Sequence, residues 1–310
     1  MSIGFDQSAK RALVAWNGRN LAPYEAITVK RLSPALGAEI GGVNLANGVS
    51  DEQLAEIRRA LGENLAIVFR DQPLTPEQHK AFARRFGQLH QHKLAAKQAT
   101  PEQKVDHDVL AWRTDAASRF TAGEAWHADV TCDEQPLWGS LLRVPELPIS
   151  GGGDTAFANM YLAYDFLSDA LKAFLEGLTA IHDGALPWTS AYGIRPDDGS
   201  SYPQAEHPVI LTHPFTGRKL LFVNPGFTTR IKQLEKEESE ALLAFLFRHV
   251  ERHPVLQVRI NWTPNALVFW DNWATQHHAI WDYYPNVREG QRVSVIVDTP
   301  LHAATPGWAA

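Results

Sequence analysis

Apolar residues recur with a helical period in four segments of the chain. Two of these segments open with a capping box, because Ser50 and Thr75 each stand three residues before a glutamine. Pro76 supports the second start, since proline is favoured at the first helical position, and Gly87 marks the end of that helix. The predicted helices cover 51–61, 76–86, 167–178 and 235–250.

Short apolar runs predict strands, most of them in the second half of the chain. The runs on either side of the FTGR turn, which contains Gly217, predict a β-hairpin. Helices early in the chain followed by many short strands favour an α+β fold built on a β-sandwich or barrel. The predicted strands cover 64–71, 138–144, 207–214, 219–224, 255–262, 266–272 and 292–299.

Two long polar stretches, 93–125 and 185–206, show no clear period. Loops of that length in a compact domain are usually functional, so both are predicted to be active-site loops. No internal repeat, low-complexity tract or Gly/Ser linker interrupts the sequence. We therefore predict a single domain over residues 1–310.

The composition narrows the class of protein and its partners. The 310 residues are 45% hydrophobic and 21% charged, the balance of a soluble globular protein, and the formal net charge of −6 argues against a nucleic-acid partner. No run approaches the roughly 20 apolar residues of a membrane span, and the N-terminus lacks the apolar core of a signal peptide. The single cysteine, Cys132, excludes an internal disulfide and fits a reducing compartment, so we expect a cytoplasmic protein without a membrane partner.

The stretch AWHADVTCDE, residues 125–134, places His127 two residues before Asp129. In an extended segment these side chains point to the same side and offer two ligands to a metal, while His277 or His278 is the candidate third. Two histidines and one carboxylate on one face suit non-haem Fe(II), which needs open positions for a co-substrate and O₂. Zinc accepts the same ligands, so the ligand types alone leave the metal open.

Two arginines late in the chain indicate an anion site. Arg288 and Arg292 are four residues apart, so an extended segment places both on one face. A guanidinium presents a planar fork to carboxylate, sulfonate or phosphate. Two such groups near an open metal site suggest two small anionic molecules, an organic-acid co-substrate and a separate substrate.

The order in which these motifs occur along the chain identifies a protein family more specifically than any single motif does. The chain resembles the taurine dioxygenase family, also called the taurine/2,4-dichlorophenoxyacetate dioxygenase family, of Fe(II)- and 2-oxoglutarate-dependent oxygenases. This resemblance implies a double-stranded β-helix core, a cupin-like jelly roll, flanked by helices. The similar blocks are LGAEIGGVNL (36–45), VFRDQPLTPEQHKAFARRFGQLHQH (68–92), WHADVT (126–131), ELPISGGGDT (146–155), LFVNPGFTTRI (221–231) and WDNWATQHHAIWDYYP (270–285), continuing to Arg292.

The resemblance also implies a metal site and a co-substrate site. His127, Asp129 and His277 match the iron ligands of the family, and His277 takes the histidine of its T-Q-H motif. Arg288 matches the arginine that pairs with the distal carboxylate of 2-oxoglutarate, and Thr155 matches the hydroxyl that helps to hold the same group.

For the substrate, the resemblance implies that Arg292 and His92 grip a sulfonate and that Phe227 forms a pocket wall. His90 shares a face with His92, and we expect it to be structural because no carboxylate stands at matching spacing. Two segments that border the substrate in the family, TAGEAWHAD and ALPWTSAYGIRPDDG, differ from the taurine enzymes.

The implied reaction is hydroxylation of a small anionic substrate, with 2-oxoglutarate and O₂ as co-substrates and succinate and CO₂ as co-products. An alkylsulfonate such as taurine is the leading substrate, and hydroxylation beside sulfur would release sulfite and an aldehyde. The alternatives are an alkyl sulfate ester, an aryloxyalkanoate or another carboxylate, a zinc hydrolase, and a metal-binding jelly roll without turnover. Family members tend to self-associate, so a homo-oligomer, dimer or tetramer, is expected.

Overall fold

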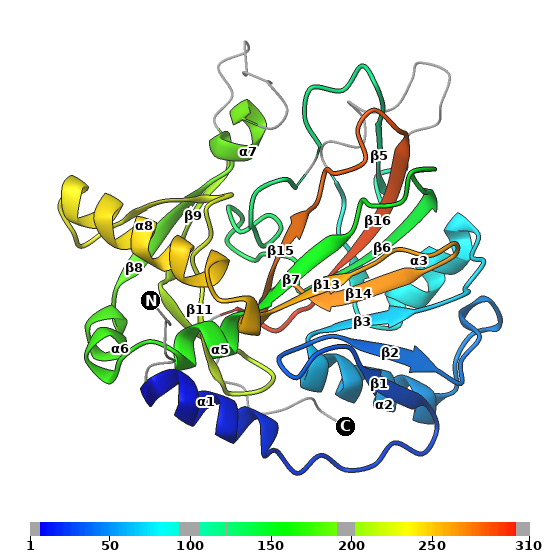
Figure 1. The fold of residues 1–310 in the computed structure, drawn as a ribbon, viewed down its shortest axis with the longest axis horizontal. Coiled ribbons are helices and arrows are strands. Elements are labelled where there is room, and N and C mark those ends of the chain that lie inside the picture. The colour runs from blue at the N-terminus through cyan, green and yellow to red at the C-terminus, as the bar shows by residue number, and fades with distance from the viewer. Residues whose placement is uncertain (1–6, 93–105, 122, 191–201, 302–310) are drawn as a thin grey trace.

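Sheets of mostly antiparallel strands face each other at the centre of the molecule, with β2 and β3 as a parallel pair (Figure 1). The computed structural model describes residues 7–92, 106–121, 123–190 and 202–301. A large sheet has the strand order β1-β2-β3-β14-β6-β16-β4, and β5 joins it by pairing with β16. The bounds of its strands are β1 Thr28–Arg31, β2 Ala38–Gly41, β3 Ala66–Phe69, β4 Gln88–Leu89, β5 Leu110–Thr114, β6 Gly139–Glu146, β14 Leu267–Asp271 and β16 Arg288–Ile296.

A smaller sheet, with the order β13-β7-β15, packs over the large one. Phe157 of β7 contacts Trp270 of β14 with 5.5 Å between ring centroids, so aromatic side chains fill the space between the two sheets. This pair of sheets is a jelly roll, as the resemblance implied. A third sheet, β12-β8-β9, and the hairpin β10-β11 complete the strands. Their bounds are β7 Thr155–Asn159, β8 Thr179–Asp183, β9 Gln204–Pro208, β10 Ile210–Thr212, β11 Lys219–Leu221, β12 Thr228–Ile231, β13 Gln257–Ile260 and β15 Thr275–Ala279.

Helices cover the outside of these sheets (Figure 1). Helix α2 contacts β3 and β14, α3 contacts β16, and α5 contacts β11. None of the helices in the described ranges is long and apolar enough to cross a bilayer. The helix bounds are α1 Gln7–Asn17, η1 Leu45–Asn47, α2 Asp51–Asn64, α3 Pro76–Arg84, α5 Met160–Asp165, α6 Asp169–Leu175, α7 Ala185–Ser190, α8 Lys236–Glu251 and η2 Pro254–Leu256.

Both predicted capping boxes are confirmed. The Ser50 hydroxyl accepts from the backbone N–H of Gln53, whose side chain accepts from the Ser50 N–H, and Thr75 and Gln78 form the same pair of hydrogen bonds. The helices at 51–61 and 235–250 are also confirmed, as α2 and α8. Helix α3 ends at Arg84, before the predicted end at Gly87.

Some of the predicted element boundaries were wrong. The helix predicted over 167–178 is shorter, because Ser168 caps its start and α6 ends at Leu175. The strand predicted over 207–214 is divided: β9 ends at Pro208, and β10 begins at Ile210 to pair with β11 in the predicted hairpin. Proline lacks the N–H that a continuous ladder would need.

The two predicted loops contain regular structure. Within 93–125, strand β5 pairs with β16 over five residue positions, from Leu110 to Thr114. Within 185–206, helix α7 is followed by the start of β9. The segments 93–105 and 191–201 of these loops lie outside the described residues.

Candidate active site

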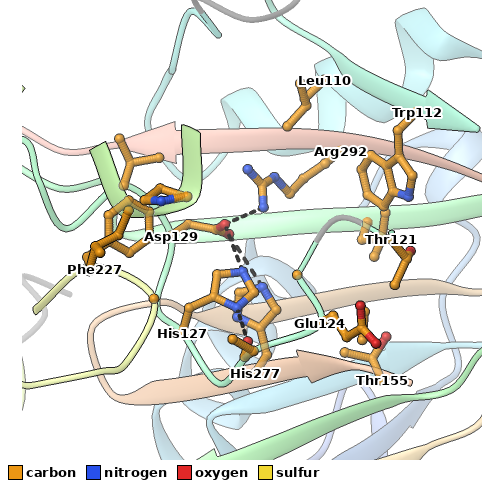
Figure 2. A pocket seen from close by; sticks show the side chains of 18 of the residues that line it. Leu110, Trp112, Thr121, Glu124, His127, Asp129, Thr155, Phe227, His277 and Arg292 are labelled. Carbon is orange, nitrogen blue, oxygen red and sulfur yellow. Dashed lines mark hydrogen bonds and ion pairs between the residues drawn. The ribbon is translucent and has the colours of Figure 1, made fainter. Parts of the chain in front are cut away.

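A cavity of about 570 Å³ opens at one end of the jelly roll. Its walls come from the segment before β6, from β7, β15 and β16, and from the turn that precedes β12. Figure 2 shows the side chains that point into it. All eight residues proposed from the sequence line this one cavity: His92, His127, Asp129, Thr155, Phe227, His277, Arg288 and Arg292.

Backbone hydrogen bonds bring the two candidate metal-binding histidines together. The N–H of His127 donates to the carbonyl of His277 at 3.0 Å, and the N–H of His277 donates back at 2.7 Å. Among the described residues His127 forms only this isolated bridge, and the chain turns soon after it, where Val130 has a positive φ of 53°. The extended segment expected through Asp129 is therefore replaced by a bridge followed by a turn. The two imidazole centroids lie 4.1 Å apart.

The side chains of His127, Asp129 and His277 place three possible ligand atoms within 4.8 Å of one another (Figure 2). The Nε2 atoms of His127 and His277 lie 3.7 and 3.8 Å from the two oxygens of Asp129. The Nδ1–H of His127 donates to the carbonyl of Ala125 at 2.7 Å, which leaves Nε2 unprotonated and facing the carboxylate. His278 packs against Trp126 and lies outside this cluster, so the structure brings His277 and not its neighbour to the site.

Burial and charge set the protonation states of this cluster. Burial lowers the pKa of both His127 and His277, so the imidazoles are neutral. Burial alone would raise the pKa of Asp129, but the charge and the hydrogen bond of Arg292 outweigh it and hold that pKa below its usual value. Neutral imidazoles and an ionised carboxylate are the forms that bind a divalent metal, so the residues fit such an ion.

Asn272 holds the backbone of Asp129 in place, a contact that the sequence did not reveal. Its side-chain oxygen accepts from the Asp129 N–H at 2.8 Å, and its amide nitrogen donates to the Asp129 carbonyl at 3.0 Å. The same amide donates to the carbonyl of Leu137, and Asn272 is fully buried. In the sequence, Asn272 of W-D-N is a polar residue directly after a buried strand, and this position was the signal that could have pointed to its role.

Arg292 lies beside this group of two histidines and one carboxylate. Its Nη1 donates to Asp129 Oδ1 at 2.5 Å, and its Nε has no hydrogen-bond partner among the described residues. His92 is buried nearby, and its pKa falls to about 2, first because of burial and then because of Arg292. His92 is therefore a neutral imidazole, and Phe227 contributes an apolar wall to the same cavity.

Arg288 and Thr155 form a second polar region of the cavity. The Arg288 side chain is buried, and its Nε also lacks a partner in the described part of the chain. Gly153, in the GGGDT turn, leaves space for it: a Cβ there would stand 2.9 Å from Cδ of Arg288. The Thr155 hydroxyl accepts a hydrogen bond from Nε1 of Trp262, a residue that the sequence reasoning missed.

The remaining walls of the cavity are mostly apolar. The indole of Trp112 crosses the strand that carries both arginines, and it occupies the space where a side chain at Gly290 would lie. Cys132 is buried and also lines the cavity, and the rings of His90 and His92 pack edge to face with 4.9 Å between their centroids. Other apolar side chains that line the cavity are Leu110, Phe120, Leu142 and Leu186.

Comparison with known proteins gives consistent matches over nearly the whole chain. The sequence profile described as "Taurine catabolism dioxygenase TauD, TfdA family" matches residues 28–294. The chain is 33% identical to an alpha-ketoglutarate-dependent sulfonate dioxygenase of Saccharomyces cerevisiae, across 89% of this chain and 68% of that protein. It is 31% identical to an alpha-ketoglutarate-dependent sulfate ester dioxygenase of Pseudomonas putida, across 89% and 91%.

A solved structure supports the fold. A taurine dioxygenase from Burkholderia xenovorans superposes with a TM-score of 0.74 and 34% sequence identity, and the match covers 89% of this chain and 91% of that one. The jelly roll predicted for this chain is therefore confirmed.

Proposed function

Since the chain belongs to the TauD, TfdA family of Fe(II)- and 2-oxoglutarate-dependent dioxygenases, we propose that it hydroxylates a small organic anion in this cavity, with an alkylsulfonate such as taurine as the leading substrate. The observation that carries the proposal is the meeting of the histidine–carboxylate cluster with two buried arginines in one cavity. The histidine–carboxylate cluster can bind the iron that the oxygen chemistry requires. The two arginines can each bind one anion, the co-substrate or the substrate.

His127, Asp129 and His277 are the proposed ligands of the iron. When bound, the iron and 2-oxoglutarate supply the oxidising chemistry, in which O₂ is consumed and 2-oxoglutarate becomes succinate and CO₂. The protein holds the ligands in their binding forms: Ala125 sets the tautomer of His127, and Asn272 fixes the backbone of Asp129.

Arg288 and Thr155 are the proposed anchors of the distal carboxylate of 2-oxoglutarate. A guanidinium with an unpartnered Nε, buried beside a threonine hydroxyl, offers donors and a positive charge away from bulk water. Burial lowers the pKa of Arg288, and the neighbouring Tyr283 opposes that shift. A bound carboxylate would supply the negative charge that this buried guanidinium lacks.

Arg292 and His92 are the proposed anchors of the substrate anion. Because Arg292 also contacts Asp129, an anion paired with its outer edge would lie next to the metal site. His92 is neutral, so it provides a ring N–H and no second charge. Phe227 and the apolar walls would contact the organic part of the substrate.

A guanidinium and an imidazole distinguish anions poorly, so an alkyl sulfate ester, an aryloxyalkanoate or another carboxylate are the second candidates. The similarity to the sulfate ester dioxygenase of Pseudomonas putida favours the alkyl sulfate ester among these.

We also propose that the enzyme is a cytoplasmic homo-oligomer. Light scattering during size-exclusion chromatography would measure the mass of the assembly.

The first experiment uses the protein loaded with Fe(II) and 2-oxoglutarate without oxygen. We expect the weak visible charge-transfer band of a 2-oxoglutarate complex, and then succinate release in air with a panel of sulfonates, sulfate esters and aryloxy acids. Sulfite released from taurine would identify the leading substrate. Folded protein that shows no band, or that turns over without 2-oxoglutarate, would contradict the proposal.

A further inference from the structure

Trp262 lies behind the cavity wall and contacts both proposed anchors of 2-oxoglutarate. Its Nε1 donates a hydrogen bond to the Thr155 hydroxyl at 3.2 Å, and both side chains are buried, at 6% and 3% exposure. Its ring also faces the guanidinium of Arg288, with Cζ 5.8 Å from the ring centroid. Trp262 follows strand β13, in which Ile260 pairs with Thr155 of β7. The strand register therefore sets this contact.

The chemistry of these two groups determines the direction of every hydrogen bond at Thr155. An indole Nε1–H can only donate, so the Thr155 oxygen must accept from Trp262. The hydroxyl hydrogen is then left to donate elsewhere. Within the described residues this hydroxyl has no other hydrogen-bond partner, and it lines the cavity. It must therefore donate to whatever acceptor occupies the cavity beside it.

We propose that Trp262 is a positioning residue for 2-oxoglutarate, which turns the Thr155 hydroxyl into an obligate donor to the distal carboxylate. This inference rests on the proposed function, in which Thr155 and Arg288 hold that carboxylate. With Arg288 also a pure donor, the two anchors present only donors and a positive charge to a ligand between them. These two side chains favour an ionised carboxylate over a group whose end carries N–H donors.

The test compares binding of 2-oxoglutarate to the anaerobic Fe(II) protein, measured by titration of the charge-transfer band. Trp262→Phe keeps an aromatic ring but removes the N–H, and we expect the dissociation constant to rise about fivefold, the effect of losing one neutral hydrogen bond. Trp16→Phe is the matched control, because its buried indole donates to the carbonyl of Pro34, away from the cavity, and should leave binding unchanged.

A double-mutant cycle separates this role from simple packing. In the Thr155→Val background, Trp262→Phe should weaken binding no further. The preference for 2-oxoglutarate over 2-oxoglutaramate, whose distal group is an amide, should also fall in Trp262→Phe, since the freed hydroxyl can then rotate to accept. Trp262→Leu provides a second variant without the N–H if the phenylalanine variant does not fold.

Two results would overturn the inference while leaving the proposed function intact. One is wild-type affinity for 2-oxoglutarate in folded Trp262→Phe. The other is an equal loss in the presence and absence of the Thr155 hydroxyl, which would show that Trp262 acts through packing or through Arg288. A wild-type protein that binds Fe(II) but no 2-oxoglutarate would instead contradict the proposed function and this inference with it.

Discussion

At the scale of single residues, neighbours in the sequence have different environments. His277 and His278 are adjacent in β15, yet their side chains point to opposite sides of the strand because the pleat alternates. His277 faces Phe157, Trp270 and the carboxylate of Asp129, whereas His278 packs against Trp126. The register of β15 on β7, with His277 opposite Phe157, selects which imidazole enters the cavity.

This difference gives a direct prediction for metal binding. His277→Ala should abolish binding of Fe(II), because it removes one of the three proposed protein ligands. His278→Ala is the matched control and should bind Fe(II) with nearly wild-type affinity. Anaerobic titration with Fe(II), or with Mn(II) followed by electron paramagnetic resonance, measures both. The opposite ranking of the two variants would show that the choice of ligand is wrong.

At the scale of elements, strand β16 carries the two arginines that are proposed to bind anions. Arg288, Gly290 and Arg292 occupy every second position of this strand, so they lie on the same face. The strand pairs with β5 on one side and with β6 on the other. Trp112 of β5 lies directly opposite Gly290, and its indole occupies the space between the two arginines. Because Gly290 has no side chain, the indole of Trp112 can lie between the side chains of Arg288 and Arg292.

Gly290→Ala tests this arrangement. The new Cβ would stand 2.2 Å from Cζ2 of Trp112, so the indole must move. We expect a loss of about 1–3 kcal/mol in unfolding free energy, as for other overpacked cores, and a higher KM for the substrate. Urea unfolding and steady-state kinetics measure the two effects. In a Trp112→Leu background the same substitution should be nearly neutral; an unchanged penalty there would mean that the indole is not the obstacle.

Helix α3 docks on the sheet through a buried histidine. The ring of His79 donates from Nε2 to the carbonyl of Leu141 in β6 at 3.2 Å. Burial, with a contribution from Arg143, lowers the pKa of His79 from 6.5 to about 3. The buried ring is therefore neutral, while the same ring in the unfolded chain binds a proton below pH 6.5.

The stability of the fold should consequently fall with acid. Between pH 6.5 and about 3 the unfolded chain binds a proton at His79 that the folded chain does not, so unfolding free energy decreases as pH falls through this window. The slope from this histidine is about 1.4 kcal/mol per pH unit. Urea unfolding of the metal-free protein at several pH values gives the slope, and His79→Gln should make it shallower. An identical slope in the variant would rule out this contribution.

At the scale of the whole molecule, the site exists only after the sheets have assembled. The proposed metal ligands come from the segment before β6 and from β15, and the proposed anion anchors come from the segment after β4, from β7 and from β16. Residues as far apart in the sequence as Asp129 and Arg292 contact each other. An unfolded chain cannot present this constellation, so metal and 2-oxoglutarate should bind the folded state alone.

Ligand removal should therefore lower thermal stability. A ligand that binds only the folded state at 100 times its dissociation constant adds about 2.7 kcal/mol, which corresponds to a rise of roughly 5 °C in Tm for a chain of this size. We expect that rise when Fe(II) and 2-oxoglutarate are added to chelator-treated protein without oxygen, as followed by circular dichroism. His277→Ala should show no shift with the metal. A shift of equal size in that variant would place the metal elsewhere.

Local signals in the sequence predicted local structure well. The capping boxes at Ser50 and Thr75 and the apolar period of 235–250 depend on residues within a few positions of each other, so α2, α3 and α8 were predicted near their observed places. Among the strands that were not predicted, β5 and β15 are short and mix polar with apolar residues without a clear period. Those strands are stabilised by pairing with distant segments, which no local pattern records.

By itself, the sequence determined four of the helices, two of them with their capping boxes, and the strand-rich second half. Through the order of its motifs it also determined the family and eight of the residues that line the cavity, while α1, α5 and α7 were not predicted. Only the tertiary structure decided which distant residues contact each other in the site. Two backbone hydrogen bonds join His127 to His277, and Asn272 forms hydrogen bonds with the backbone of Asp129. Trp262 donates a hydrogen bond to Thr155. The physical reason is distance along the chain: each of these contacts joins segments more than 100 residues apart. Such contacts depend on how the sheets pair and face each other, and the spacing of residues along one strand or helix does not encode that.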